Sequence, residues 1–445
     1  MRSSQDSAAA TPTLRQALPT WIKVACLSFG GPAGQIAVMQ RLLVDERRWI
    51  SQRRFLHALN YCMLLPGPEA TQLAAYIGWL MHRWRGGLAA GVIFVLPGFL
   101  SILVLSIVYA GWGDVPLVES VFYGIKPAVL AIVVHALVRI AQRALASGYL
   151  LAIAIAAFVG IFAFGVPFPA IIAGSALAGW IGGRLGAEAL ISPALPGVGD
   201  PPEPESVPPP PLHRTAATAA LWLALWWVPV GLLAVTAGGT VFLEEAVFFS
   251  KTASVTFGGA YAVLAYVAQR AVADFGWLAP GEMLDGLGMA ETTPGPLIQV
   301  VQFVGFLGAY RDPGNLHPMI AGALGSVVTT WVTYVPCFLF IFVGAPYVEH
   351  LRGRKELNAA LSAITAAVVG VILNLALWFA TRTLFGATER PGWRMLDLEL
   401  PVWSTVDPVA AAIALGAVLA LFGLRRGILE TIAASAAVGV ALRLL

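Results

Sequence analysis

Phe29-Gly30-Gly31 and Pro66-Gly67-Pro68 return later in the chain as Phe257-Gly258-Gly259 and Pro294-Gly295-Pro296. The two motifs have the same separation in both copies, and a tryptophan lies at the same place between them. Such a shared register indicates an internal duplication. Glycine and proline interrupt membrane helices, and their symmetric recurrence in apolar segments is typical of a binding site formed between two repeats.

The composition is that of a membrane protein. Of the 445 residues, 58% are hydrophobic and only 11% are charged, and the mean hydropathy is +0.79. A soluble globular domain carries about 25% charged residues. We therefore predict an all-α polytopic membrane protein of two homologous repeats, with about 12–13 membrane segments and helices broken at the Gly-Gly-Pro and Pro-Gly-Pro motifs. An odd number of crossings between the copies would make the repeats inverted.

Composition divides the chain into four regions. Residues 1–16 form an N-terminal tail rich in serine and alanine, and residues 17–190 form the first membrane repeat. Residues 191–215 are a proline-rich, acidic linker with too little apolar surface to fold. The second membrane repeat occupies residues 216–445.

Several classes of function are disfavoured by the sequence. The net charge of +3, without a soluble basic domain, gives no case for nucleic acid. The cysteines Cys26, Cys62 and Cys337 are scattered through apolar segments without metal-ligand spacing, so we expect small buried side chains there and no metal site. Neither a Cys/His cluster nor a nucleotide-binding loop occurs, so we expect no cofactor and no enzymatic activity.

The helix breaks predict an anion-binding site. In hydrocarbon an unpaired backbone amide costs several kcal/mol, so a break persists where it is buried in protein or lines a polar cavity. Each helix that resumes after a break presents free N–H groups and the positive end of its dipole. One break alone is as well explained as a kink or a packing point, but duplication favours a site. The candidate backbone positions are Gly30, Gly31, Pro32, Pro66, Gly67, Pro68, Gly258, Gly259, Pro294, Gly295 and Pro296.

Polar side chains occupy matching places in both repeats. Lys23 and Lys251 each lie six residues before Phe-Gly-Gly, and Gln72 and Gln299 follow the two Pro-Gly-Pro motifs. An intramembrane lysine is functional by default, whereas one near a helix end can extend to the interface. The glutamines either donate hydrogen bonds to the anion or join two helices. Lys126 likewise either faces the cavity or ends a span.

Three side chains are candidates for proton coupling. Glu69 lies in the first turn after Pro66-Gly67-Pro68, and Glu291 lies just before the second Pro-Gly-Pro motif. An acid beside each anion-binding turn suggests coupling to protons, with a helix-capping carboxylate as the alternative. His135, on an apolar segment, either relays protons or is a core histidine.

At these motifs the sequence resembles the chromate ion transporter family, in its long, two-domain form. The resemblance covers nearly the whole chain except the termini and the linker. In the second half it includes Thr256-Phe-Gly-Gly259 and Thr293-Pro-Gly-Pro-Leu297. The runs that carry it in the first half are Ser28-Phe-Gly-Gly-Pro-Ala-Gly-Gln35, Glu46-Arg-Arg-Trp-Ile50, Leu65-Pro-Gly-Pro-Glu-Ala70 and Leu96-Pro-Gly98. The family motif also falls on Gln35, Arg48 and Trp49.

The resemblance implies export of chromate from the bacterial cytoplasm across the inner membrane, giving chromate resistance. We expect a chromate (oxyanion) transporter driven by the proton gradient, whose partners are the small oxyanion and the lipid bilayer, with a homodimer left open. Three alternatives remain at this point. They are a transporter of sulfate or another anion with the same fold, a passive anion channel, and a membrane-embedded enzyme such as a chromate reductase.

Overall fold

The computed structural model describes residues 12–63, 65–113, 115–185, 211–257, 260–347, 355–389 and 400–444. Most of the predicted linker, and both Gly258 and Gly259, lie outside the described residues. The chain forms two compact units, and each contains segments from both predicted repeats. The first unit comprises Met1–Val104, Ala194–Ala260 and Thr293–Arg352, and the second comprises Leu105–Pro193, Tyr261–Thr292 and Gly353–Leu445.

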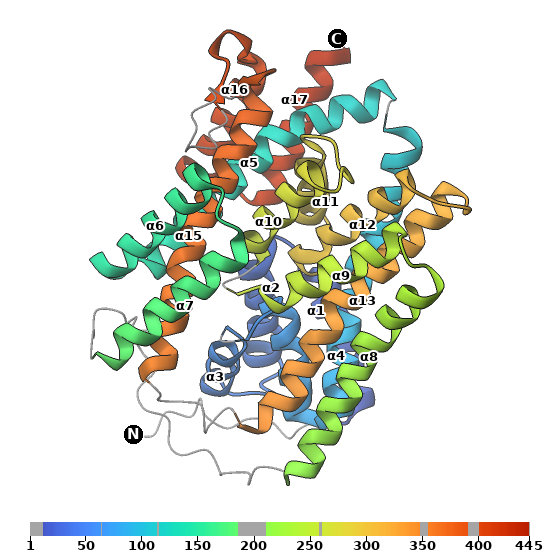
Figure 1. Ribbon diagram of the computed structural model, residues 1–445, viewed down its shortest axis with the longest axis vertical. Coiled ribbons are helices and arrows are strands. Elements are labelled where there is room, and N and C mark those ends of the chain that lie inside the picture. Colours follow the sequence, from blue (N-terminus) through green and yellow to red (C-terminus); the bar gives the residue numbers. More distant parts are fainter. Residues whose placement is uncertain are drawn as a thin grey trace. The chain divides into compact units, whose positions relative to one another are not determined.

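The first unit is built of helices alone in the residues described (Figure 1). Helix α13 packs against α8, α9 and α12. In chain order the elements are α1 (Leu14–Leu27), α2 (Gly31–Gln40), the π-helix η1 (Arg41–Glu46), α3 (Gln52–Cys62), α4 (Glu69–Trp112, with its last residues in the second unit), α8 (Leu212–Thr236), α9 (Val241–Ser254), the 3-10 helix η3 (Leu297–Gln299), α12 (Val300–Arg311), α13 (Pro318–Gly344) and the 3-10 helix η4 (Ala345–Tyr347).

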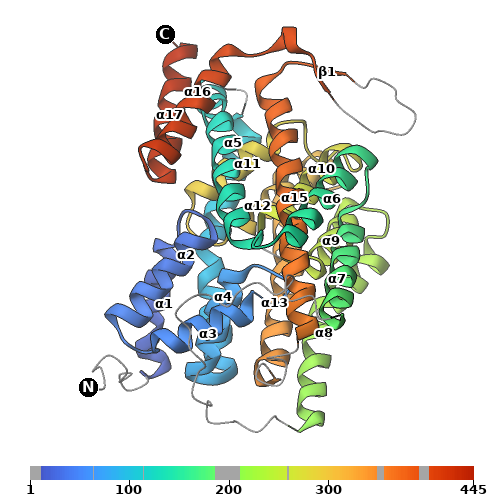
Figure 2. The same cartoon turned by 90° about the vertical axis from the view of Figure 1, so that its left-hand side faces the viewer.

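The second unit is organised around the long helix α15, which packs against α5, α6 and α7 (Figure 2). Small residues allow these close contacts, since a Cβ at Gly370 would lie 2.2 Å from the Ala154 carbonyl oxygen. The elements are α5 (Pro116–Ala144), α6 (Gly148–Phe164), α7 (Phe168–Arg184), α10 (Ala260–Ala273), α11 (Glu282–Thr292), α15 (Lys355–Leu384), the strands β1 (Thr388–Glu389) and β2 (Leu400–Pro401), the 3-10 helix η5 (Trp403–Thr405), α16 (Pro408–Val418), the π-helix η6 (Leu419–Gly423) and α17 (Ile428–Leu444).

The prediction of an all-helical membrane protein is confirmed. The described residues contain five helices that are long and apolar enough to cross a membrane, namely α4, α5, α8, α13 and α15. The only strands described form one short antiparallel pair. The number of membrane segments and the inverted orientation of the repeats stay predictions.

The sequence explains why α1 and α2 are separate helices. Thr13 caps the start of α1 in a capping box with Gln16. Helix α1 ends at Leu27, and the chain turns into α2 at Gly30 and Gly31, whose φ angles of 76° and 70° lie in the left-handed region that favours glycine. Pro32 stands in the first turn of α2, where its missing N–H costs no hydrogen bond. The predicted break therefore occurs at the predicted residues.

Helix α4 consists of two arms joined at His82 and Arg83, whose backbone angles are not helical. The arms meet at glycines, because a Cβ at Gly78 would lie 2.4 Å from the carbonyl oxygen of Gly86. The second repeat has the same contact at the matching residues. A Cβ at Gly325 on α13 would lie 2.4 Å from the carbonyl oxygen of Gly305 on α12. Each Pro-Gly-Pro motif is thus followed by a helical hairpin with a glycine crossing.

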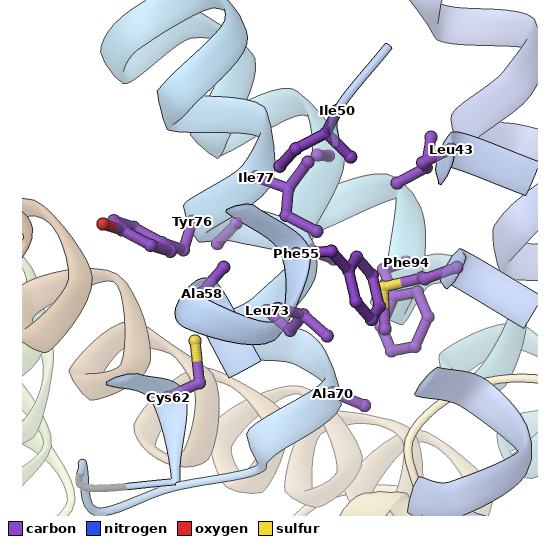
Figure 3. Packing of buried hydrophobic residues seen from close by; sticks show 14 of the residues in the cluster. Leu43, Ile50, Phe55, Ala58, Cys62, Ala70, Leu73, Tyr76, Ile77 and Phe94 are labelled. Atoms are coloured by element: carbon purple, nitrogen blue, oxygen red, sulfur yellow. The ribbon is translucent and has the colours of Figure 1, made fainter. Parts of the chain in front are cut away.

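A buried apolar cluster holds the first hairpin against α3. Phe55 of α3 and Phe94 of the second arm are both fully buried, and Figure 3 shows them lying close to each other. Leu73 and Ile77 of the first arm are also fully buried in this cluster. Trp49 packs against the same cluster, so this motif residue has a packing role.

Gly78→Ala is expected to lower the free energy of unfolding by about 1–3 kcal/mol, as overpacking does in close-packed interiors. The atom in the way is a backbone oxygen, which cannot move without separating the arms. Gly174→Ala on α7 is the matched control, because nothing lies within 4 Å of a Cβ there. Thermal unfolding of the purified variants measures both effects, and an unchanged midpoint for Gly78→Ala would contradict the tight crossing.

Candidate anion site

In the first unit, the two copies of the duplicated motifs hold each other by a pair of equivalent hydrogen bonds. The N–H of Gly67, in the first Pro-Gly-Pro motif, donates to the carbonyl oxygen of Thr256 at 2.7 Å. The N–H of Gly295, in the second, donates to the carbonyl oxygen of Ser28 at 2.9 Å. Ser28 and Thr256 directly precede the two Phe-Gly-Gly motifs. Each Pro-Gly-Pro turn is therefore bonded to the broken helix of the other repeat.

Hydroxyl groups at the ends of α1 and α9 support this exchange. The Ser28 hydroxyl donates to the carbonyl oxygen of Val24 at 2.6 Å, and the Thr256 hydroxyl donates to that of Thr252 at 2.7 Å. Both bonds go to carbonyl groups in the last turn of the helix, and the Thr252 carbonyl oxygen also accepts from the Val255 N–H at 3.1 Å. The backbone carbonyls of Ser28 and Thr256 remain available for the Pro-Gly-Pro glycines.

Both Pro-Gly-Pro glycines are required by their geometry. Gly67 has a φ of 128° and Gly295 a φ of 109°, angles that other residues rarely adopt. A Cβ at Gly67 would lie 2.8 Å from Nε2 of Gln72 and 3.1 Å from Sγ of Cys337. A Cβ at Gly295 would lie 2.9 Å from the Cα of Gly98. Each turn thus lies against a residue of the other repeat's hairpin, Cys337 for the first turn and Gly98 for the second.

The glutamines predicted from the sequence lie around these turns. Gln35, on α2, donates from Nε2 to the carbonyl oxygen of Gly295 at 2.6 Å. Gln72 donates from Nε2 to the carbonyl oxygen of Pro66 at 2.7 Å. Gln299 accepts a hydrogen bond of 2.7 Å from the Tyr334 hydroxyl, and its Nε2 donates to Oε1 of Gln302. Gln35 and Gln72 thus fix the Pro-Gly-Pro turns, while Gln299 belongs to a helix–helix network.

Two buried polar atoms beside the first turn are unsatisfied. Among the described residues, neither the Thr71 hydroxyl nor Oε1 of Gln72 has a hydrogen-bond partner, and both side chains are fully buried. Buried polar groups are nearly always hydrogen-bonded, so these two mark a place for a ligand or water. The first intrahelical bond of α4 runs from the N–H of Gln72 to Pro68, so the preceding amides have no acceptor within the helix. Sequence reasoning missed Thr71, although a hydroxyl residue in the turn after Pro-Gly-Pro is a usable signal.

The two matched lysines lie on the helices that lead into the breaks. Lys23 is exposed on α1, and its Nζ lies 3.8 Å from Oε2 of Glu46. Lys251 is exposed on the last turn of α9. Positive charge near a helix C-terminus is favourable in itself. These positions suit an anion entering along the helix ends as well as an interfacial anchor.

Of the three proton-coupling candidates, one lies in the first unit and two lie in the second. Glu69 is half-buried in the first turn of α4, next to the first Pro-Gly-Pro motif. Glu291 is buried on α11 in the second unit, where the Tyr261 hydroxyl donates to its Oε1. His135, on α5 of the same unit, packs edge-on against Phe422 with ring centroids 5.1 Å apart. Glu69 is the candidate that lies at the paired turns, that is, the two Pro-Gly-Pro turns bonded to the opposite repeat.

The second unit contains an ion pair between the partly exposed Lys126, which the sequence analysis considered, and a buried aspartate, which it did not. Nζ of Lys126 lies 3.2 Å from Oδ2 of Asp285, which also accepts a hydrogen bond of 2.9 Å from the Tyr109 hydroxyl. Asp285 is only 1% exposed. The available signal was an aspartate within the apolar run of α11. Lys126 therefore neutralises a buried carboxylate.

The comparisons with known proteins agree with the duplicated architecture. The family described as "Chromate transporter" matches residues 15–180 and 243–440. The chain belongs to the chromate transporter family. The chromate transport protein of Pseudomonas aeruginosa is 32% identical over 80% of this chain and 79% of its own length. That of Cupriavidus metallidurans is 28% identical over 84% and 85%. An uncharacterised transporter of Methanocaldococcus jannaschii is 22% identical over 83% and 85%.

Family membership and the apolar helices together identify a multi-pass bacterial membrane protein. No solved structure matches the chain significantly. The expectation for the cysteines is correct for Cys62 and Cys337, which are buried, and wrong for Cys26, which is exposed on α1.

Proposed function

We propose that this protein moves chromate across the bacterial inner membrane, out of the cytoplasm, in exchange for protons. The observation that carries the proposal is the pair of equivalent hydrogen bonds by which Gly67 and Gly295 tie each Pro-Gly-Pro turn to the opposite repeat. Relatives named as chromate transport proteins support the choice of substrate. Movement of one repeat against the other would open such a shared site to alternate sides of the membrane.

The anion is bound by the helical turns that follow the motifs. The N–H groups of Gly67 and Gly295 are already engaged by carbonyl oxygens, so the donors are the amides of the next turns, at the start of α4 and of η3. The helix dipole adds positive potential there without a charged side chain. The Thr71 hydroxyl is a further donor to the oxyanion, and it is buried without another partner among the described residues.

No covalent step is needed for this function. The relatives are named as transport proteins, and binding and release of an intact oxyanion require only amides, hydroxyls and positive charge. A chromate reductase would instead have to be shown by loss of Cr(VI) in the presence of purified protein and an electron donor. We expect the oxyanion to leave the protein unchanged.

Sulfate is the strongest alternative substrate, because backbone amides recognise charge and shape rather than the central atom. Uptake of labelled chromate and labelled sulfate by membrane vesicles, with and without the protein, distinguishes the two. We expect chromate transport that sulfate inhibits weakly. Sulfate transport that chromate does not compete with would contradict the proposal. A passive channel would carry chromate down its gradient regardless of the proton gradient.

Lys23→Gln and Lys251→Gln are each expected to weaken chromate binding about two- to fivefold, because a dianion gains from a cation near the helix end but water and salt screen an exposed charge. The matched control is Lys355→Gln, at the exposed start of α15 in the other unit. Titration calorimetry on the purified variants measures the dissociation constants. Wild-type affinity in both lysine variants would show that they are interfacial anchors and leave the backbone site as the sole anion site.

A further inference from the structure

The first unit also contains an acid that is fully buried, on a helix other than the one that carries Glu69. Glu245, on α9, has no exposed surface. Among the described residues, neither of its carboxyl oxygens has a hydrogen-bond partner of normal geometry. A carboxylate that is buried without a cation is costly, and such a group normally holds a proton instead. The carboxyl group of Glu245 is therefore expected to be protonated and neutral in this buried position.

The carboxyl group lies at the glycine crossing of the second hairpin. A Cβ at Gly325 on α13 would lie 3.0 Å from Oε2 of Glu245 and 2.4 Å from the carbonyl oxygen of Gly305 on α12. A Cβ at Gly305 would lie 2.0 Å from the Thr329 hydroxyl oxygen, which has no hydrogen-bond partner among the described residues. Three helices thus enclose a carboxyl group and a hydroxyl group, with glycine backbone on both sides.

The buried carboxyl group and hydroxyl group occur in the second repeat and have no polar counterpart in the first. In the register that pairs Lys23 with Lys251, Glu245 corresponds to Ala17. In the register of the hairpins, Thr329 corresponds to Ala90, and the side chain of Ala90 packs on Gly78 just as Thr329 packs on Gly305. The fold therefore tolerates alanine at both places. A buried acid and hydroxyl that packing does not require indicate a function.

Few charged groups surround Glu245. Its neighbour Glu244, which is exposed on the same helix, is the charged residue whose field acts on it, and the backbone of Ala309 on α12 lies close enough to favour negative charge. Helix α13 carries no charged residue, and its titratable side chains are Tyr334 and Cys337. The charged groups of the other packed helices lie at their ends, at Arg311 of α12 and in the first turn of α8. Among the described residues of these helices, no cation is therefore placed to neutralise the carboxylate.

We propose that Glu245 is a proton-binding site of the transport cycle, distinct from Glu69. With α9 closed on the crossing of α12 and α13, the carboxyl group keeps its proton. When α9 separates from the crossing, water reaches the carboxyl group, the proton leaves and the ionised form is hydrated. Because α9 leads through Lys251 to the Thr256 carbonyl that holds Gly67, this movement reaches the anion site. The inference rests on the proposed function for its place in transport, but not for the protonation itself.

Glu245→Gln tests the protonation directly. Infrared difference spectra of purified protein, recorded between neutral and alkaline pH with and without chromate, should show a protonated-carboxyl band that Glu245→Gln removes. Glu244→Gln, which changes the adjacent exposed residue, should keep the band. Persistence of the band in Glu245→Gln would overturn the proposal. A double variant, Glu245→Ala with Thr329→Ala, restores the residues of the first repeat and should fold even if the single variant does not.

Proteoliposomes test the role in transport. With an imposed pH gradient, Glu245→Gln and the double variant should lose at least tenfold in the rate of chromate transport, while chromate affinity and its pH dependence stay within about twofold of wild type. Glu244→Gln, which removes only the field of an exposed charge, should stay within about twofold of wild type in every measurement. Transport by the double variant at the wild-type rate would overturn the proposal. If wild-type protein binds no chromate while the carboxyl band is still removed by Glu245→Gln, the proposed function fails and the proton site stands.

Discussion

Gly67→Ala and Gly295→Ala are each expected to abolish chromate transport. A side chain at a left-handed φ costs about 1–2 kcal/mol on its own. At Gly67 the new Cβ would also meet Gln72 at 2.8 Å, and at Gly295 it would meet the backbone of Gly98 at 2.9 Å. Relief of either contact moves the glycine N–H away from its carbonyl acceptor in the other repeat. The anion-binding turns then lose their alignment.

Transport of labelled chromate into inverted vesicles measures this effect, with protein amount checked by immunoblot. Gly231→Ala on α8 is the matched control, because nothing lies within 4 Å of a Cβ there. We expect less than a tenth of the wild-type rate for Gly67→Ala and Gly295→Ala, and the full rate for Gly231→Ala. Wild-type transport by both motif variants would show that the paired turns take no part in chromate transport.

Glu69→Gln is expected to keep chromate binding, remove its pH dependence and abolish proton-driven transport. Glu69 stands in the first turn of α4, beside the proposed anion donors. An ionised carboxylate repels the oxyanion, and a protonated one tolerates it, so occupancy by chromate and by the proton is coupled. The glutamine has the shape of the protonated acid and cannot ionise. It therefore fixes the site in its anion-binding form.

Chromate affinity measured across a pH series tests this coupling. In the wild type, affinity should rise as pH falls and Glu69 takes up its proton, whereas the Glu69→Gln variant should give one affinity throughout. Glu430→Gln, at an exposed position on α17, is the control and should behave as wild type. If Glu69→Gln still pumps chromate under a proton gradient, Glu69 is a capping residue and coupling lies at Glu245, Glu291 or His135.

Much of the fold was predictable because duplication and glycine-proline breaks are local signals. The break at Gly30 and Gly31 and the restart of α4 after Pro68 follow directly from backbone preferences. The bonding of each Pro-Gly-Pro turn to the opposite repeat was not predictable in detail. It depends on which carbonyls, far away in the sequence, face the turn.

The same limit applies to the side chains that sequence reasoning missed. Thr71 and Asp285 carried a weak sequence signal, but their roles, like that of Glu245, become clear only when burial and partners are known. In the sequence, Asp285 and Glu245 are both acids in apolar helices and cannot be told apart. In the structure, Asp285 has a lysine partner, whereas Glu245 has no cationic partner among the described residues. The opposite error concerns Lys23 and Lys251. Their shared register suggested buried cations in the site, but both side chains are exposed.

The most direct measurement is a crystal structure with bound chromate in which chromium is located by its anomalous X-ray scattering. We predict chromium beside the first helical turns after Pro68 and Pro296, within reach of the Thr71 hydroxyl. Mutation of Thr71 to valine should then lower the occupancy of chromium. A chromium position in the second unit, at the Lys126–Asp285 pair, would contradict the claim that the duplicated Pro-Gly-Pro turns form the substrate site.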